Sequence, residues 1–325
     1  MSAITKDNNS NDGTDALPES VAAVEWLTVL LIVSTYAGWF AMTYAYRSWP
    51  LLIVAPVVAA LITLQCSVQH EILHGHPTRN SRVNSYFGML SLTLWLPFVR
   101  YRDAHLVHHH DERITDPLDD PESFYWRPED WQRLNRVVRA MVWAMQTLAG
   151  RFLIGSSWFI GTYLIAEVRG VWRNDAGLRR AWLVHLFFCL PALLWLTIVC
   201  GMPIWLYVVA MVIPSYGLLL TRSFAEHRAR DAVRERIAIV ERSWILGPLF
   251  LFNNLHALHH ETPWLPWYRY GARYRRHRDR LIADNGGLIY CTYFDVARRF
   301  LLRPHDTPQH PTGRAPMPSA QAGWS

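Results

Sequence analysis

The sequence predicts an all-α integral membrane protein with two transmembrane helical hairpins, four spans in all, and a cytoplasmic helical cap that carries histidine-rich segments. Three observations predict this fold class. Hydrophobic residues make up 51% of the 325 residues, and tryptophan alone occurs 16 times. Four apolar stretches are each near the ~20 residues that a helix needs to cross ~30 Å of hydrocarbon. All 32 Lys and Arg residues lie outside those stretches, and only Arg47 falls on the far side of the membrane in this arrangement.

The chain begins with a polar segment, residues 1–20, which we expect to be disordered. It lacks a basic region followed by an apolar core, so no cleavable signal peptide is expected. The first hairpin is predicted over residues 21–46 and 50–68, and the second over residues 181–200 and 203–221. Positively charged loops tend to remain in the cytoplasm, which predicts a multi-pass protein of the cytoplasmic (inner) membrane with both termini and the cap inside.

Two shorter apolar stretches, residues 83–99 and 152–168, are predicted to be re-entrant or interfacial. If residues 83–99 crossed the membrane, the histidine-rich segments before and after them would lie on opposite faces. Those segments could then never meet, so we expect this stretch to dip into the membrane and return.

One membrane domain is therefore expected over residues 21–302. Residues 303–325 contain five prolines and little to bury, which predicts a disordered tail. His305 and His310 belong to this tail, and we assign them no function.

Histidines gather in four segments, "HEILHGH" (70–76), "HLVHHH" (105–110), "EHR" (226–228) and "HALHH" (256–260). On a helix, residues at i, i+3 and i+4 lie on one face, so most histidines of a segment point the same way. His76 and His110 point away from those faces and are expected in supporting or surface positions. The candidate metal ligands are His70, His74, His105, His108, His109, His227, His256, His259 and His260.

The number of these histidines predicts two metal ions. Neutral imidazoles suit iron, zinc, copper and nickel, and several of them can surround an ion without adding charge. The histidines of the three larger segments are too many for one ion of ordinary coordination number. His227 stands alone, but it follows the fourth predicted span as His70 follows the second, and Glu226 beside it can orient a neighbour.

Two other classes of protein compete with this interpretation. The first segment also matches H-E-x-x-H, in which two histidines bind zinc and the glutamate is the general base of a peptidase. A peptidase leaves the other histidines unexplained, so we expect Glu71 to hold the ring N–H of a ligand or an arginine. A metal transporter needs ionisable groups along its spans, where only Glu25 and His185 occur.

The order of the motifs resembles the membrane fatty acid desaturase superfamily of histidine-box diiron proteins: H-x-x-x-H, H-x-x-H-H, a single histidine and H-x-x-H-H, over about residues 25–280. The flanks "DERITDPLDDPESFYW" and "HHETPWLPWYRY" look most like bacterial desaturase-like and rhizopine-oxygenase-like members. The resemblance implies that the nine histidines named above hold two irons. Some relatives place an asparagine four residues before the lone histidine, where this chain has Ser223; Asn253 is a candidate substitute or a helix cap.

The resemblance also implies an activity, that of an O₂-dependent diiron fatty acid desaturase-like oxidoreductase acting on a lipid acyl chain from the bilayer. Hydroxylation, carotenoid ketolation and oxidative O-demethylation are alternatives within the superfamily, and zinc can replace iron during purification. The sequence shows no nucleotide-binding fingerprint, cysteine cluster or haem module, so a separate ferredoxin or cytochrome is expected to supply electrons. The basic run 273–280 is expected to bind that partner or anionic lipid, and no nucleic acid.

Overall fold

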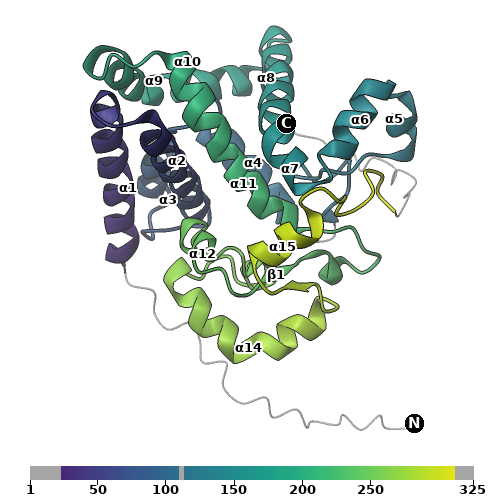
Figure 1. The fold of residues 1–325 in the computed structure, drawn as a ribbon. Helices are drawn as coiled ribbons and strands as arrows, with labels where there is room; N and C mark the ends of the chain where they lie inside the picture. The colour runs from purple at the N-terminus through teal and green to yellow at the C-terminus, as the bar shows by residue number, and fades with distance from the viewer. Residues whose placement is uncertain (1–22, 110–112, 312–325) are drawn as a thin grey trace, which may run out of the picture.

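The computed structural model describes residues 23–109 and 113–311, and this part of the chain is mostly helical (Figure 1). The expected disorder of residues 1–20 and the predicted position of His110 lie outside the described residues. The elements are α1 (Trp26–Tyr44), α2 (Leu51–Leu73), α3 (Ser81–Met89), α4 (Phe98–His108), α5 (Pro128–Arg133), α6 (Arg136–Ala144), α7 (Leu148–Gly150), α8 (Ser156–Trp172), α9 (Ala176–Leu194), α10 (Ile204–Tyr207), α11 (Ile213–Glu226), β1 (Ile239–Val240), α12 (Leu246–Leu249), α13 (His256–Glu261), α14 (Tyr270–Asp284), β2 (Ile289–Tyr290) and α15 (Tyr293–Phe300).

Five helical segments of the described part are long and apolar enough, by length and composition, to cross a membrane. They indicate a membrane protein, as predicted. Four of them overlap the expected spans, and the fifth contains residues 152–168, which we predicted to be re-entrant or interfacial. The predicted count of four spans is therefore not confirmed. The five segments are Trp26–Arg47, Leu51–Leu73, Leu148–Trp172, Ala176–Val199 and Ile204–Glu226.

The long helices share an apolar core around the fully buried Trp39 of α1. Polar groups inside this core are paired with one another. The indole N–H of Trp39 donates to the hydroxyl of Tyr207 at 3.0 Å, and that hydroxyl donates to the carbonyl of Leu92 at 2.7 Å. Hydrocarbon offers no hydrogen-bond partners, so polar groups can lie in this core only when they are paired with one another. They tie α1 and α10 to the connection between α3 and α4.

Residues 83–99 do not form one long helix. The nine residues of α3 are too short, at ~1.5 Å per residue, to cross ~30 Å of hydrocarbon. The chain turns after α3, and the carbonyl of Leu90 accepts hydrogen bonds from the Tyr36 hydroxyl at 2.7 Å and from Gln65 Nε2 at 3.1 Å. This turn brings α4 back beside the end of α2, where the first two histidine segments meet.

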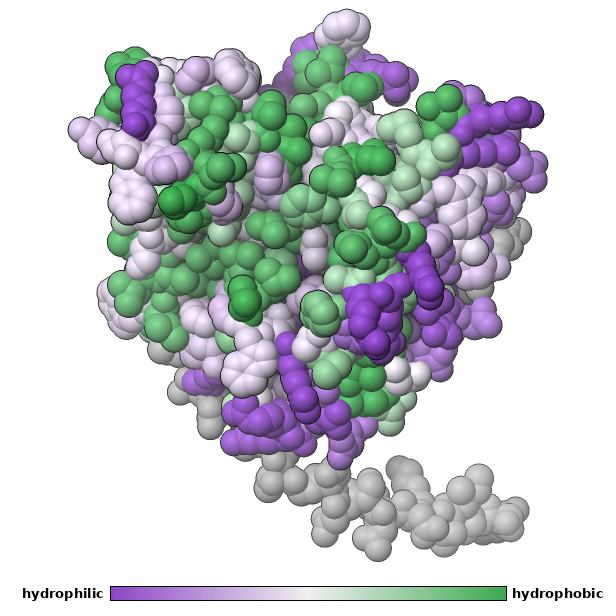
Figure 2. Space-filling model, in the orientation of Figure 1, coloured by the Kyte–Doolittle hydropathy of each residue, from purple (hydrophilic) through white to green (hydrophobic). Residues whose placement is uncertain are grey.

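The surface divides into an apolar part and a hydrophilic part. Figure 2 shows apolar side chains over α1, α9 and α11, and hydrophilic side chains over α14 at the bottom of the view. Leu52 and Phe187, on the long helices α2 and α9, are 90% and 71% exposed. Large apolar side chains with this exposure are expected on a surface that faces lipid.

The prediction of a disordered tail is wrong for residues 303–311. Trp126 and Gln309 form a parallel backbone bridge, and the Trp126 N–H donates to the Pro308 carbonyl at 2.8 Å. Prolines prevent this segment from forming a helix, but they leave its other backbone groups free to pair with a distant loop. The rest of the predicted tail, residues 312–325, lies outside the described residues.

The two histidines of that segment are structural. His305 is buried, and its Nε2 forms a hydrogen bond with the Tyr290 hydroxyl at 2.7 Å. Burial lowers the pKa of His305 to about 4, which keeps its ring neutral. His310 is also buried, with its Nε2 3.1 Å from the Thr115 hydroxyl. Both side chains anchor the C-terminal segment, a role that its composition did not indicate.

Candidate metal centre

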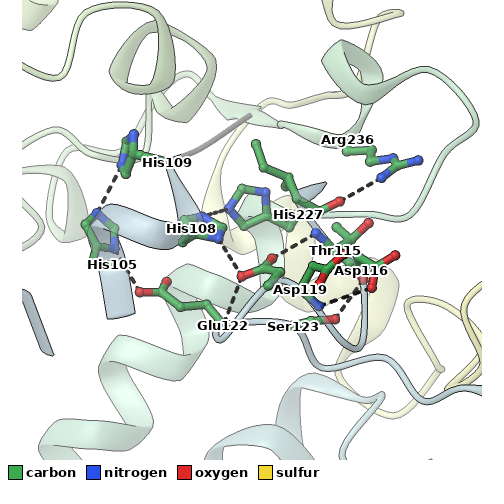
Figure 3. Close-up of polar contacts among 12 residues, drawn as sticks. His105, His108, His109, Thr115, Asp116, Asp119, Glu122, Ser123, His227 and Arg236 are labelled. Carbon is green, nitrogen blue, oxygen red and sulfur yellow. Dashed lines mark hydrogen bonds and ion pairs between the residues drawn. The ribbon is translucent and has the colours of Figure 1, made fainter. Parts of the chain in front are cut away.

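The histidine segments lie at helix ends that come together in the fold. His70 lies in the last turn of α2, and His74 caps that helix. His105 and His108 lie in the last turn of α4, and His227 follows α11 directly in an extended conformation. The third segment forms α13. Figure 3 shows the ring of His108 from α4 pointing toward the ring of His227.

The side chains of all the candidate ligands fall into two groups. Within each group the ligand atoms lie within 4.8 Å of one another, so each group could hold a metal ion. The division does not follow the sequence, because His108 belongs to one group and its neighbour His109 to the other. The groups are His70, His74, His105, His109 and His259 on one side, and His108, His227, His256 and His260 on the other.

The distances between ring nitrogens fit shared coordination of an ion. His227 Nε2 lies 3.1 Å from His108 Nε2 and 2.9 Å from His256 Nε2. In the other group, His259 Nε2 lies 3.0 Å from His109 Nε2. Two nitrogens at right angles around an ion, each ~2.1 Å from it, are about 3.0 Å apart. The two groups therefore have the spacing of metal coordination shells.

The tautomers of two rings support the same conclusion. His105 Nδ1 lies 2.8 Å from Glu122 Oε1 (Figure 3), and His108 Nδ1 lies 2.9 Å from Asp120 Oδ1. A carboxylate accepts hydrogen bonds, so Nδ1 of each ring carries a proton, and Nε2 is the nitrogen left to bind a metal. When deprotonated, each Nε2 offers a lone pair toward the other rings of its group. A cation can bind there, and the residues thus fit a metal.

Burial keeps most of the candidate ligands neutral. The pKa values of several rings lie well below the usual value, first because burial disfavours the charged form and then because other histidines are close. Neutral imidazole is the form that binds metals. The rings with strongly lowered pKa values outside the long helices are His74, His227, His256, His259 and His260.

Asp120 and Glu122 are functional candidates that sequence reasoning missed. Burial opposes the charged form of Glu122, but His105 and His108 hold its pKa well below the usual range. Burial also opposes charge on His108, and the two carboxylates nevertheless raise its pKa to about 9. A carboxylate on the far nitrogen of a ligand ring fixes its tautomer and orientation. The only sequence feature that indicated them is the acidic run after the second histidine segment. The spacing of that run does not indicate which of its carboxylates contacts a ligand histidine.

Two neighbouring residues have roles that differ from expectation. Glu71 contacts neither a ligand ring nor an arginine among the described contacts, and its Oε2 accepts from the Trp267 backbone N–H at 3.2 Å. Glu71 lies about 100° around the helix from the preceding histidine and so faces away from the metal groups. His76 is buried, with its Nδ1 2.6 Å from Glu25 Oε1.

Asn253 supports a ligand ring, and α13 has Leu255 at its N-cap. The side-chain oxygen of Asn253 lies 3.1 Å from His256 Nδ1. It thus orients His256 in the way that Asp120 orients His108.

The fold and the site together define a helical membrane protein with two groups of buried and half-buried histidines that could hold metal ions. The fatty acid desaturase family model matches residues 47–293, well over half of the 325-residue chain. The chain belongs to the fatty acid desaturase family, as its histidine motifs predicted. Comparison with individual curated proteins finds no match. Members of this family are oxidoreductases and typically bind iron, with which the histidine groups are compatible.

Proposed function

We propose that the protein is a membrane-bound, non-haem diiron oxidoreductase that uses O₂ and external electrons to desaturate a lipid acyl chain. The observation that carries the proposal is the division of the candidate ligands into two groups of converging imidazoles, which are buried or half-buried. Each group would hold one iron. Family membership supports iron over other metals that accept the same ligands.

The irons, when bound, would supply the O₂ chemistry that breaks an unactivated C–H bond, which side chains cannot break. The protein's own residues would hold the irons and orient the ligand rings. Asp120 and Glu122 fix the tautomers of His108 and His105. His108, His256 and His259 are each no more than 2% exposed, so these three rings are shielded from bulk water.

Lipid profiling tests the proposal. We expect cells that express the wild-type protein together with a ferredoxin system to accumulate a new unsaturated acyl chain, detected by gas chromatography. The new peak is expected to disappear in the His259→Ala variant and when the ferredoxin system is omitted. A hydroxylated product would assign the chain to the hydroxylase alternative. If the wild type and the His259→Ala variant are both present in the membrane, an unchanged lipid profile would contradict acyl desaturation and favour a carotenoid or methoxy substrate.

The site also constrains the membrane topology. Three of the five apolar segments lie between His108 and His227, whose Nε2 atoms are 3.1 Å apart. Three crossings would place these histidines on opposite faces, so an even number is required. We propose that Leu148–Trp172 lies along the membrane interface, because it has the lowest mean hydropathy of the five, 1.2, and carries Glu167 in an ion pair with Arg100 at 3.0 Å. Four spans then remain.

We further propose that the metal centre and the C-terminal part face the cytoplasm, and Cys291 provides the test. Among the free cysteines, Cys291 is exposed, whereas Cys66, Cys189 and Cys200 are buried. We expect a membrane-impermeant maleimide to leave Cys291 unlabelled in intact spheroplasts and to label it in inside-out vesicles. The Cys291→Ser variant controls for labelling elsewhere. Labelling of the wild type in intact spheroplasts would show the opposite orientation.

The electron donor is proposed to be a separate ferredoxin or cytochrome that docks on the hydrophilic side. The basic helix α14 lies there, and its Arg275 and Arg276 side chains are exposed. Arg278 and Arg280 are already paired with carboxylates, at Glu241 and Glu261. This surface suits an acidic partner or anionic lipid headgroups.

A further inference from the structure

Arg151 is a buried charge that neither the fold nor the metal centre explains. It is 3% exposed, and its Nε donates to the Met145 carbonyl at 2.8 Å. Its Nη1 is buried and has no hydrogen-bond partner in the described part of the chain. None of the ion pairs found among the described residues includes this guanidinium. A buried cation without an anion is strongly destabilising, so a ligand that supplies the anion is the natural explanation.

Aromatic rings hold the guanidinium in place. Its Cζ lies 4.0 Å from the ring centroid of Phe124 and 5.7 Å from the centroids of Phe159 and Phe224. A guanidinium stacked in this way keeps its planar orientation while its N–H groups at the edge remain available for a planar anion. Stacking fixes the direction of the group, but it does not neutralise its charge.

Arg151 lines a cavity of about 350 Å³. That volume lies within the ~300–1,000 Å³ of small-molecule sites, and the lining combines apolar and aromatic surface with polar and charged groups. The lining contains one carboxylate, Asp130, which is half-buried and bound to Arg127 Nε at 2.6 Å. This carboxylate is thus paired with Arg127. The aromatic lining residues are Phe124, Tyr125, Trp126, Trp158 and Phe159.

Two segments of the chain connect the surroundings of Arg151 with the metal centre. Phe124 follows two residues after Glu122, whose carboxylate contacts His105. Phe224 precedes His227 by three residues. A molecule whose charged end binds Arg151 would therefore lie against segments that also carry residues of the metal centre.

We propose that this cavity binds the acidic group of an amphipathic substrate, a carboxylate or phosphate monoester on an apolar body, with Arg151 as its counter-ion. This inference rests on the proposed oxidoreductase function and names the substrate class for it. It predicts that the substrate is a free carboxylic acid or a phosphate monoester, in preference to a neutral carotenoid or alkane.

Equilibrium binding to the iron-loaded, full-length protein tests the inference. The probes are radiolabelled decanoate, decyl phosphate and decanol, which share one apolar chain. We expect decanoate or decyl phosphate to bind the wild type about tenfold or more tightly than decanol, because a charge-assisted hydrogen bond accounts for at least that factor. The tighter of the two anions identifies the acidic group. Equal binding of all three probes would overturn the inference without any variant.

Arg151→Met is expected to lose this preference while it binds decanol as the wild type does, and Arg151→Lys is expected to keep part of it. The matched control is Arg136→Met, which removes the same charge from an exposed position outside the cavity. Undiminished anion binding in Arg151→Met would contradict the assignment. Iron content is measured in the same samples. Loss of the anion preference in Arg151→Met with unchanged iron content would support this inference. The diiron proposal is tested separately, because it fails if the wild type binds no iron.

Discussion

Replacing His227 or His259 by alanine is expected to abolish turnover and to remove the iron held by the group to which that histidine belongs. Each side chain supplies a nitrogen to a different group, and each lies 3.0 Å or less from another candidate ligand of its group. Loss of one nitrogen opens a coordination position in a site that these buried rings alone define. The measurements are iron per protein chain by atomic emission and product by gas chromatography.

The control for this prediction is His277→Ala. His277 lies on α14 and belongs to neither histidine group, so the variant is expected to retain wild-type iron and activity. Full activity in His227→Ala would remove that residue from the ligand set, and the same result in His259→Ala would do so for His259. Loss of one iron with retained activity would refute the requirement for two metals.

Asp120→Asn is expected to lower iron affinity and activity by about 10- to 100-fold, the usual effect of removing an outer carboxylate from a metal-bound histidine. One oxygen of Asp120 contacts His108 Nδ1 at 2.9 Å, and the other accepts from the Thr115 N–H at 2.8 Å. The loop thus holds the carboxylate rigidly against the ring. Asparagine preserves the size but loses the charge that makes His108 a stronger base. Iron affinity is measured by competition with a chelator.

Asp119→Asn is the matched control, because Asp119 is adjacent in the chain but exposed, with only a 3.5 Å ion pair to Arg113. It is expected to leave iron affinity unchanged. An equal loss in both variants would mean that the loop, and not the contact with His108, accounts for the effect. Wild-type affinity in Asp120→Asn would show that His108 needs no anionic support.

The candidate ligands were predictable because their signal is local. Helical geometry repeats about every 3.6 residues, so H-x-x-x-H and H-x-x-H-H specify a shared face wherever the helix lies. The long apolar stretches were predictable for the same reason, since their length is set by the thickness of hydrocarbon. The stretch 152–168 was harder, because interfacial and spanning helices differ in their surroundings more than in their composition.

The supporting residues of the site were not predictable. Asp120 and Glu122 follow the second histidine segment in an acidic run that also contains the exposed Asp119. Which carboxylate turns back to the metal groups depends on the path of the loop. The same holds for His305, which composition placed in a disordered tail and which packs against Tyr290.

The chemistry of this protein follows from its sequence, and the arrangement of that chemistry follows from its tertiary structure. Spacing along single helices indicated which histidines can bind metal. Only the positions of α2, α4, α13 and the end of α11 separate His108 from His109 and place them in different groups. The counter-ion position of Arg151 beside Phe124 is likewise a product of contacts between distant segments. Local periodicity is set by backbone geometry, whereas these contacts arise from packing between helices, which no single segment encodes.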